Sequence, residues 1–381
     1  MEASDIRVAL FSGNYNYVKD GANQALNLLV GYLLDRGVTA RVYSPTTDTP
    51  AFPPTGDLVS VPSFPVPGGR DEYRFATGMS AEVRRDLEGF RPNIVHVSAP
   101  EMLGHAAVKW AHRHGVKSVA SFHTRFETYF DYYGVGFVRP LILRIYRKFY
   151  NKFDLVMPPA KSMEDKLREW GVTTPIAYWS RGIDHDRFDP ARRSLEWRRS
   201  LGIGDDEVAV GFLGRLVKEK GLDIFAEVTA ELTRRGVAHK VLVVGKGPAR
   251  DWFAAHAPHA IFAGFQAGDD LGRAVASMDM LFNPSVTEAF GNVTTEAHAA
   301  GVPVIGAIAT GTIDIVQNGK TGFLVPPRDV TAYADAIQTL AQDADMRARF
   351  SAAAHESVRG YVWDTVNQAV LDGYLRLLND A

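Results

Sequence analysis

Residues 208–215 read VAVGFLGR, an apolar, β-branched run that ends in a glycine and a basic residue. Parallel strands that are buried on both faces give runs of this kind, without alternation of polar and apolar residues. Helix-length amphipathic segments, such as 222–235, lie between this run and others like it. Such alternation predicts an α/β protein with doubly wound parallel sheets and right-handed crossovers. The predicted strands are 7–12, 41–44, 94–98, 118–123 and 155–158 in the first half, and 208–213, 240–245, 261–265, 280–283, 302–306 and 322–325 in the second.

A polar, charged and proline-containing segment, residues 184–200, interrupts this pattern near the middle of the chain. The chain has 381 residues, which is too long for one ordinary hydrophobic core. We therefore expect a Rossmann-like domain over 1–185, a second one over 186–360, and a closing helix within 361–381. Ligands of such sheets bind at the carboxyl ends of the strands, so residues that follow strands in both halves should line one cleft.

The composition excludes several classes of protein. Hydrophobic residues make up 46% and charged residues 23%, as in ordinary soluble proteins, and the net charge of −2 gives no field for nucleic acid. The chain has no cysteine, which excludes disulfides and cysteine-ligated metals. Neither a signal-peptide pattern at the start nor an apolar run long enough to span a membrane is apparent, so the expected compartment is the cytoplasm.

The sharpest motif is residues 284–296, PSVTEAFGNVTTE, which follows a predicted strand and leads into a predicted helix. Glu288 lies in the loop and Glu296 in the helix. Gly291 permits close backbone approach, and the amides of a helix start suit a phosphate. One carboxylate could reach sugar hydroxyls while the other accepts from a ribose. The alternative is an acid that favours the helix dipole together with an unrelated surface glutamate.

A second motif, GRLVKEKG at 214–221, follows the strand predicted at 208–213. It places Arg215 and Lys220, two cations framed by glycines, at a strand end. Fixed cations of this kind stabilise the negative charge of a departing nucleotide diphosphate. The alternative is a solvated basic turn.

Weaker signals lie in the first half of the chain. His123 ends a predicted strand and could project toward a ligand, although a lone histidine is more often packed structurally. In the first strand–helix turn, SGNYNYVKDGANQAL at 12–26, Gly13 and Gly21 could let backbone amides approach a phosphate or an acceptor. This turn is not a G-x-G-x-x-G fingerprint, so a dinucleotide site is unsupported.

The segment 137–152, FVRPLILRIYRKFYNK, interleaves basic and apolar side chains and contains no acid. A basic amphipathic helix of this kind suits an anionic membrane surface. The alternative is an ordinary core-facing helix with a solvated basic face. Its basic residues are Arg139, Arg144, Arg147, Lys148 and Lys152.

Three segments, GRLVKEKG, PSVTEAFGNVTTEAHAAGVPVIG and SRGIDHDRFDPARR, together resemble the retaining GT-B glycosyltransferases of family 4, group 1. HTRFETYFDYYG and the arginine of SRGID resemble the bacterial lipid mannosyltransferases and the sulfoquinovosyl-diacylglycerol synthase-like enzymes. The resemblance implies the GT-B fold: two Rossmann-like domains, an interdomain cleft and a C-terminal helix that crosses back to the N-terminal domain. It also implies a retaining hexosyltransferase that moves a hexose from a GDP- or UDP-linked donor to a membrane lipid such as diacylglycerol or a glycolipid.

Residue by residue, the resemblance makes Arg215 and Lys220 ligands of the donor diphosphate. Glu288 would contact the donor sugar, Glu296 the nucleotide ribose, and His123 would lie near the reacting sugar. The nucleotide base would dock near residues 264–265. The implied catalytic residues are His123, Arg215, Lys220 and Glu288. The implied donor-binding residues are Gly13, Gly21, Gly214, Arg215, Lys220, Gly264, Phe265, Glu288, Ala289, Phe290, Gly291, Asn292, Val293 and Glu296. The implied membrane or acceptor residues are Arg125, Tyr129, Tyr133, Arg139, Arg144, Arg147, Lys148 and Lys152.

For the mechanism we expect front-face displacement within an oxocarbenium-like ion pair. No D-x-D cluster stands beside the donor motifs, so we expect no metal and no cofactor besides the donor substrate. The expected partners are a nucleotide sugar, a lipid acceptor and an anionic membrane surface, with the protein peripheral on the inner face of the cell membrane. Two alternatives stay open: a soluble glycosyltransferase that builds polysaccharides or small glycosides, and a non-catalytic nucleotide-sugar-binding protein. Phosphorylase or epimerase chemistry is less favoured, because no motif for a pyridoxal-type lysine is present.

Overall fold

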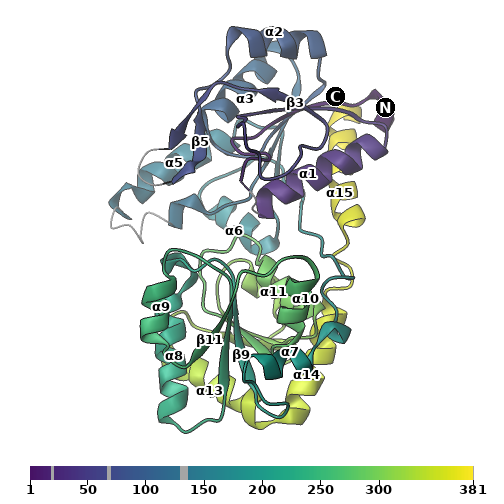
Figure 1. The fold of residues 1–381 in the computed structure, drawn as a ribbon. Helices are drawn as coiled ribbons and strands as arrows, with labels where there is room; N and C mark the ends of the chain where they lie inside the picture. Colours follow the sequence, from purple (N-terminus) through teal and green to yellow (C-terminus); the bar gives the residue numbers. More distant parts are fainter. Residues whose placement is uncertain (19–20, 67–69, 129–135, 381) are drawn as a thin grey trace. The chain divides into compact units, whose positions relative to one another are not determined.

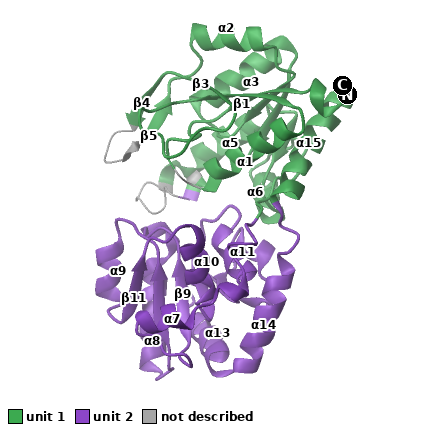
Figure 2. Cartoon of the chain, turned by 45° about the vertical axis from the view of Figure 1, so that its right-hand side comes forward, with its two compact units in different colours: residues 1–127, 137–182, 363–381 green, residues 128–136, 183–362 purple. Residues whose placement is uncertain are grey.

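The computed structural model describes residues 1–18, 21–66, 70–128 and 136–380, whose helices and strands are drawn in Figure 1. The chain forms two compact units, which Figure 2 colours separately. Unit 1 consists of Met1–Glu127, Phe137–Gly182 and Trp363–Ala381, and unit 2 of Thr128–Gly136 and Ile183–Val362. The last residues of the chain therefore belong to the same unit as the first, which confirms the predicted return of the C-terminal helix.

Unit 1 is built on a parallel sheet of six strands in the order β3-β2-β1-β6-β7-β8. The central strands are apolar because both of their faces are covered: every residue of β6 is buried, as are four of the five residues in β1 and in β7. The strands are β1 (Arg7–Phe11), β2 (Thr39–Ser44), β3 (Asp57–Ser60), β6 (Ile94–Val97), β7 (Lys117–Ser121) and β8 (Leu155–Met157).

Helices cover both faces of this sheet. On one face, α1 and α15 pack against each other, and Val370 and Tyr374 of α15 join the core formed by alternate strand residues such as Leu10 and Ile94. On the other face, α3 contacts β1, β6 and β7. The helices of unit 1 are α1 (Gly21–Asp35), α2 (Ala81–Phe90), α3 (Met102–His114), α5 (Arg139–Tyr150), α6 (Lys161–Glu169) and α15 (Trp363–Asn379).

A separate antiparallel ribbon, β4 (Ser63–Val66) and β5 (Arg70–Ala76), also belongs to unit 1. It presents the rings of Phe64 and Phe75, each 49% exposed, with their centroids 5.8 Å apart. The sequence did not predict this ribbon or the edge strand β3.

Unit 2 repeats the same architecture, with the parallel order β11-β10-β9-β12-β13-β14. One face of the sheet forms a core with α8, α9 and α13, to which Phe212, Phe225 and Phe282 contribute packed rings. The strands are β9 (Ala209–Leu213), β10 (Lys240–Val244), β11 (Ala260–Gly264), β12 (Met280–Asn283), β13 (Val304–Ala307) and β14 (Gly322–Val325). The helices are α7 (Leu195–Ser200), α8 (Leu222–Arg234), α9 (Arg250–His256), α10 (Gly268–Ala276), α11 (Asn292–Ala299), α12 (Thr312–Ile315), α13 (Val330–Gln342) and α14 (Ala344–Ser357).

Short 3-10 helices occur in both units. They are η1 (Ala3–Asp5), η2 (Phe126–Thr128), η3 (Gly136–Val138), η4 (Pro190–Arg192) and η5 (Lys218–Lys220).

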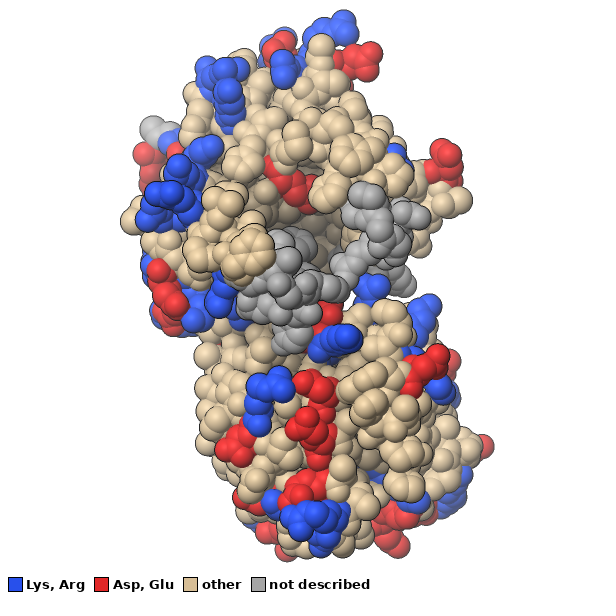
Figure 3. Space-filling model, turned by 90° about the vertical axis from the view of Figure 1, so that its left-hand side faces the viewer, with Lys and Arg blue, Asp and Glu red and all other residues tan. Residues whose placement is uncertain are grey.

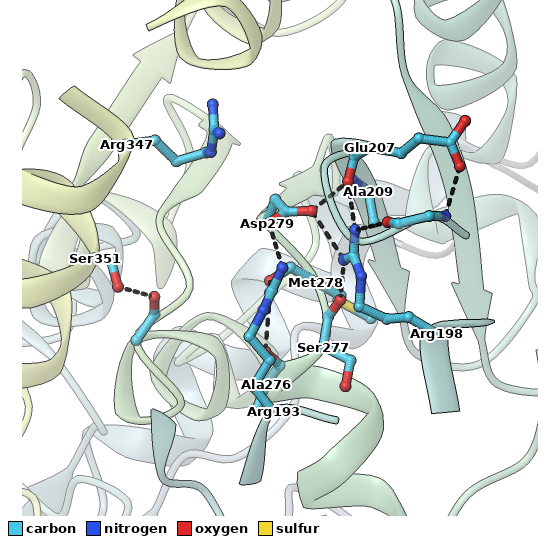
Figure 4. A network of polar contacts seen from close by, with 12 residues as sticks. Arg193, Arg198, Glu207, Ala209, Ala276, Ser277, Met278, Asp279, Arg347 and Ser351 are labelled. Carbon is cyan, nitrogen blue, oxygen red and sulfur yellow. Dashed lines mark hydrogen bonds and ion pairs between the residues drawn. The ribbon is translucent and has the colours of Figure 1, made fainter. Parts of the chain in front are cut away.

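A buried arginine ties together the amino ends of the central strands of unit 2 (Figure 4). The side chain of Arg198 is fully buried and donates to Asp279 Oδ2 (2.9 Å), to the Ser277 carbonyl oxygen (2.7 Å) and to the carbonyl oxygens of Gly204 and Glu207. The same Asp279 oxygen accepts from the first amide of β9 at 2.7 Å. Asp279 immediately precedes β12, so one carboxylate fixes the starts of two neighbouring strands.

Both sheets follow the strand order 3-2-1-4-5-6 when the β4–β5 ribbon is set aside. In such sheets the connections diverge between the first and fourth strands, and ligands bind beyond the carboxyl ends of the strands at that switch point. The switch points lie between β1 and β6 in unit 1 and between β9 and β12 in unit 2. The predicted α/β class, with two doubly wound parallel sheets, is confirmed.

Candidate active site

The loops that follow β9 and β10 in unit 2 approach each other closely. Gly214, with φ +144°, donates from its amide to the Val244 carbonyl oxygen at 3.0 Å. A Cβ atom on Gly245 would lie only 1.9 Å from the Gly214 carbonyl oxygen. Any side chain at position 245 would push these loops apart, so the glycine keeps two backbone segments together at the carboxyl edge of the sheet.

Lys220 and Glu288, predicted from separate motifs, meet at this edge. Lys220 ends η5 in the connection from β9 to α8, and Glu288 lies in the loop after β12. Their Nζ and Oε1 atoms are 2.5 Å apart, and the two side chains are 28% and 15% exposed. An ammonium group has three N–H donors, so contact with Glu288 leaves donors of Lys220 for an anionic ligand.

The loop that carries Glu288 is held by the turn after β13. The Thr310 hydroxyl donates to the Glu288 carbonyl oxygen at 2.7 Å. Gly311 has φ +81°, and a Cβ atom there would lie 2.6 Å from the Phe290 carbonyl oxygen. Gly291, with φ +98°, then caps the start of α11. Two glycines in the left-handed region therefore bring the Glu288 loop and the first amides of α11 to one place.

Glu296 lies within α11, where it is largely surrounded by protein but keeps some exposure. Burial raises the pKa of its carboxyl group to about 7, and the positive charge of Arg187 partly opposes this rise. A carboxyl group that is half protonated near neutral pH can both donate to and accept from ligand hydroxyls.

The remaining donor residues predicted in unit 2 lie at the same edge of its sheet. Arg215 is exposed directly after Gly214, on the loop that also carries Lys220. Phe265 follows β11 and is 59% exposed, and Lys246 Nζ lies 4.8 Å from the centroid of its ring. Gly264 has φ +72° and accepts from the amide of Gly245 at 2.8 Å. Ala289 and Phe290 are buried, while Asn292 and Val293 form the first turn of α11.

His123 follows β7 in unit 1 and is bonded through both ring nitrogens. Arg181 Nη2 lies 2.5 Å from Nδ1, and Ser121 Oγ lies 2.7 Å from Nε2. A guanidinium group can only donate, so Nδ1 accepts and Nε2 carries the hydrogen toward Ser121. Burial, followed by the charge of Arg181, holds the pKa of His123 well below its usual value. His123 is therefore a neutral, fixed imidazole whose ring edge faces Trp179, with centroids 5.0 Å apart.

The first loop of unit 1 brings Gly13 to the end of β1 and Gly21 to the start of α1. The Gly13 carbonyl oxygen accepts from the Tyr17 hydroxyl at 2.6 Å. Sequence reasoning did not predict the contact with His123 that is made by Arg181, the arginine of the SRGID segment. It also missed Glu101, an acid that follows the predicted strand 94–98 as Arg215 follows the strand predicted at 208–213.

Comparison with known proteins identifies the family of the chain. A family model for glycosyl transferases group 1 matches residues 207–343, and one for glycosyltransferase family 4 matches residues 19–187. A GDP-mannose-dependent alpha-mannosyltransferase of Corynebacterium glutamicum is 30% identical over 291 residues, covering 76% of this chain and 68% of that protein. This chain belongs to the group 1 and family 4 glycosyltransferases. The enzyme is a hexosyltransferase that uses a nucleotide sugar, as predicted.

Two further similarities support this family and its fold. The sulfoquinovosyl transferase SQD2 of Arabidopsis thaliana is 30% identical to the enzyme, over 94% of this chain and 71% of its own. The structure of sucrose-phosphate synthase from Thermosynechococcus elongatus superposes with a TM-score of 0.80 at 19% identity, covering 99% of this chain and all of that one. The predicted GT-B fold is thereby confirmed.

The basic segment of the glycosyltransferase forms α5 in unit 1, and only one of its faces is buried. Tyr146, Phe149 and Tyr150 are buried, whereas Phe137, just before the helix, is 82% exposed and Leu141 is 59% exposed. Figure 3 shows lysine and arginine side chains beside uncharged surface on this side of unit 1. The exposed basic and large apolar members of the segment are Phe137, Leu141, Arg144, Ile145, Arg147, Lys148 and Lys152.

Four other residues are predicted for the membrane or acceptor side: Arg125, Arg139, Tyr129 and Tyr133. Arg125 is buried, and its Nε atom lies 2.8 Å from Oε1 of the fully buried Glu127, so its charge is not on the exposed basic face. Arg139 is half-buried at the start of α5. Tyr129 and Tyr133 lie outside the described residues.

Neither a membrane-spanning helix nor a cluster of metal-ligating side chains occurs in the part of the enzyme that the structure describes. None of its helices in this part of the chain combines the length and apolarity needed to cross a bilayer. No group of three or more His, Cys, Asp or Glu side chains with the spacing of a metal site occurs among residues 1–18, 21–66, 70–128 and 136–380. Metal independence of the transferase stays a prediction.

Proposed function

We propose that this enzyme transfers a hexose, with retention of the anomeric configuration, from a GDP- or UDP-linked donor to a membrane lipid that carries a hydroxyl group. The observation that carries the donor part of the proposal is the meeting of Lys220 with Glu288 at the switch point of unit 2, beside the start of α11. GDP-mannose is the first donor to test, because the mannosyltransferase relative is named as dependent on it.

The donor diphosphate would lie against Lys220, Arg215 and the first amides of α11. Cations and a helix start aimed at one point stabilise the charge that develops on the leaving diphosphate. In this arrangement Glu288 keeps the ammonium group of Lys220 in place and directs its own carboxylate at hydroxyls of the sugar. Glu296, whose pKa lies near neutrality, would bind the ribose hydroxyls.

The reaction would proceed on one face of the sugar. The bond between the anomeric carbon and the leaving diphosphate oxygen breaks, and the bond to the acceptor oxygen forms on the same side. The acceptor proton moves to the departing diphosphate oxygen, so no protein base is needed. His123 would act as a fixed, neutral contact for the sugar, in keeping with the engagement of both its ring nitrogens. Lys220 and Arg215 would supply the positive charge that a metal provides elsewhere.

Substitution of the cations tests the donor site. Lys220→Ala and Arg215→Ala should each lower kcat/KM by about 100-fold or more, because each removes charge that is most needed in the transition state. Lys218→Ala is the matched control, since Lys218 lies exposed in the same 3-10 helix. Equal effects at positions 218 and 220 would refute the proposed diphosphate site. Activity that is lost with a chelator and restored by magnesium or manganese would refute metal independence.

A thermal-shift panel of nucleotide sugars tests the donor without knowledge of the acceptor. A ligand at 100 times its Kd stabilises the folded state by about 2.7 kcal/mol. GDP-mannose, UDP-glucose and other GDP and UDP sugars should separate clearly in the melting temperature that they produce. A protein that binds a nucleotide sugar but neither hydrolyses nor transfers it would be a non-catalytic binding protein instead.

The acceptor part of the proposal rests on α5. Its exposed face combines cations with Leu141 and Ile145, which are 59% and 38% exposed, as suits the surface of an anionic membrane. This would place the enzyme on the inner face of the cell membrane, where it meets diacylglycerol or a glycolipid. Activity on water-soluble sugars with no activity on lipids would favour the alternative, a soluble transferase.

Charge reversal tests the membrane surface directly. The triple variant Arg144→Glu, Arg147→Glu and Lys148→Glu should no longer bind vesicles of phosphatidylglycerol. Each basic residue near such a surface contributes about 1 kcal/mol to the free energy of binding. Arg84→Glu with Arg85→Glu is the control, because these arginines are exposed on α2 of the same unit. Unchanged binding of the triple variant would refute this role of α5.

A further inference from the structure

Glu101 holds a buried carboxyl oxygen at the switch point of unit 1. It follows β6 and is the residue that precedes α3, yet its side chain makes no capping hydrogen bond to that helix. Its Oε2 atom is buried and has no hydrogen-bond partner among the described residues. The residue as a whole keeps partial exposure.

The carboxyl group lies directly over the turn that follows β1. A Cβ atom on Gly13 would lie 1.9 Å from Glu101 Oε2 and 2.2 Å from Oε1. Gly13 follows β1 and Glu101 follows β6, the two neighbouring strands whose connections diverge. The acid therefore stands where a doubly wound sheet binds its ligand.

The neighbouring hydroxyl groups are engaged elsewhere. The Tyr17 hydroxyl donates to the Gly13 carbonyl oxygen at 2.6 Å. Ser98 Oγ donates to Ser12 Oγ at 2.9 Å, and Ser12 Oγ donates to the Asn14 carbonyl oxygen at 2.6 Å.

A buried carboxyl oxygen without a donor is unfavourable, and such groups in native proteins call for a functional explanation. Burial also raises the pKa of Glu101 to about 7. The side of unit 1 drawn in Figure 3 is hollowed, and acidic side-chain atoms lie inside the hollow.

We propose that Glu101, set against the turn at Gly13, binds hydroxyl groups of the acceptor, and that the end of the acceptor that enters unit 1 is an uncharged polyol. In its ionised form the Glu101 carboxylate accepts hydrogen bonds from neighbouring sugar or glycerol hydroxyls and repels a phosphate. This inference rests on the proposed transferase function and specifies its acceptor chemistry.

The first test compares acceptors. Wild-type enzyme should glycosylate a monohexosyl diacylglycerol, whose head group is neutral, in preference to phosphatidylglycerol, whose head group carries a phosphate. Glu101→Gln should lower kcat/KM for the neutral acceptor about tenfold or more, mainly through acceptor KM, because it removes hydrogen bonds to a charged group. The same variant should also lower the ratio of kcat/KM for the neutral lipid to kcat/KM for phosphatidylglycerol. Glu88→Gln, an exposed glutamate on α2, is the control.

A second variant displaces the Glu101 carboxyl group without substituting Glu101 itself. Gly13 is not in the left-handed region, so alanine fits its backbone, but the added Cβ atom must displace the Glu101 carboxyl group. Gly13→Ala should reproduce the loss seen with Glu101→Gln, and the double variant should lose little more than either single variant.

The outcomes separate this inference from the proposed function. An unchanged kcat/KM in Glu101→Gln overturns the inference, as does a wild-type enzyme that accepts only the anionic lipid. Both leave nucleotide-sugar binding and transfer intact. A wild-type enzyme that neither binds nor turns over any nucleotide sugar overturns the proposed function itself.

Discussion

Glu296→Gln should make unit 2 more stable above neutral pH, although it removes a proposed donor contact. Burial raises the pKa of Glu296 from its ordinary 4.5 to about 7. Between these two values the native protein holds a proton that the unfolded chain releases, so the free energy of unfolding falls as the pH rises. The fall begins near pH 4.5 and is complete above pH 7.

The size of the effect follows from the two pKa values. A pKa difference corresponds to about 1.4 kcal/mol per pH unit, which gives about 3 kcal/mol for the rise at Glu296. Some exposure of the side chain to solvent reduces this figure, and we expect about 2 kcal/mol. The glutamine variant lacks the titration and should be more stable than the wild type by this amount at pH 8.5, and equal to it near pH 4.

Amide hydrogen exchange read by mass spectrometry suits the measurement, because it reports on peptides of unit 2 separately from those of unit 1. Peptides from β12 and β13 are compared between variant and wild type at the same pH, from pH 5 to pH 8.5. A difference in protection that stays constant across this range would refute the reasoning. So would a variant that is less stable than the wild type at pH 8.5.

Three further predictions concern residues that the chemistry does not touch directly. Asp279→Asn removes the charge partner of the fully buried Arg198, so the free energy of unfolding of unit 2 should fall by about 3–5 kcal/mol, measured by the same exchange experiment. Gly311→Ala places a Cβ atom against the Glu288 loop at φ +81°; it should weaken nucleotide-sugar binding about tenfold or more in calorimetry while the fold persists. Arg181→Gln removes the cation beside Nδ1 of His123, so the pKa of His123 should rise toward its ordinary value, as nitrogen NMR would show, and kcat should fall.

The sequence predicted the strands well where both faces of a strand are covered. All of the central strands of both sheets appear within two residues of the predicted runs, because burial on both faces requires an unbroken apolar run. The edge strand β3 and the ribbon β4–β5 lack this signal. Pro65 interrupts β4, and Phe64 and Phe75 are half exposed, so no core selects an apolar pattern there.

The candidate site was predictable in its parts but not in its contacts. Lys220 was found because it follows a strand that ends in a glycine, and Glu288 because it lies in a loop between a predicted strand and a predicted helix. Nothing in their separation of 68 residues fixes the 2.5 Å contact, which depends on the pairing of β9 with β12. The partners of His123 and the isolation of Glu101 depend on which polar atoms find donors in three dimensions, and local sequence does not contain that information.

Buried charged groups have different surroundings at the two ends of the strands. At the amino ends of β9 and β12, the buried guanidinium group of Arg198 donates four hydrogen bonds and is matched by a carboxylate. At the carboxyl edges, Glu101 and Glu296 have pKa values raised to about 7 by burial. A fold selected for stability alone would gain from glutamine or an apolar side chain at both positions. That two acids with raised pKa values sit at the two ligand-binding edges, while the Asp279 carboxylate at the amino ends of β9 and β12 is paired with Arg198, is the pattern expected when carboxyl groups are kept for a ligand.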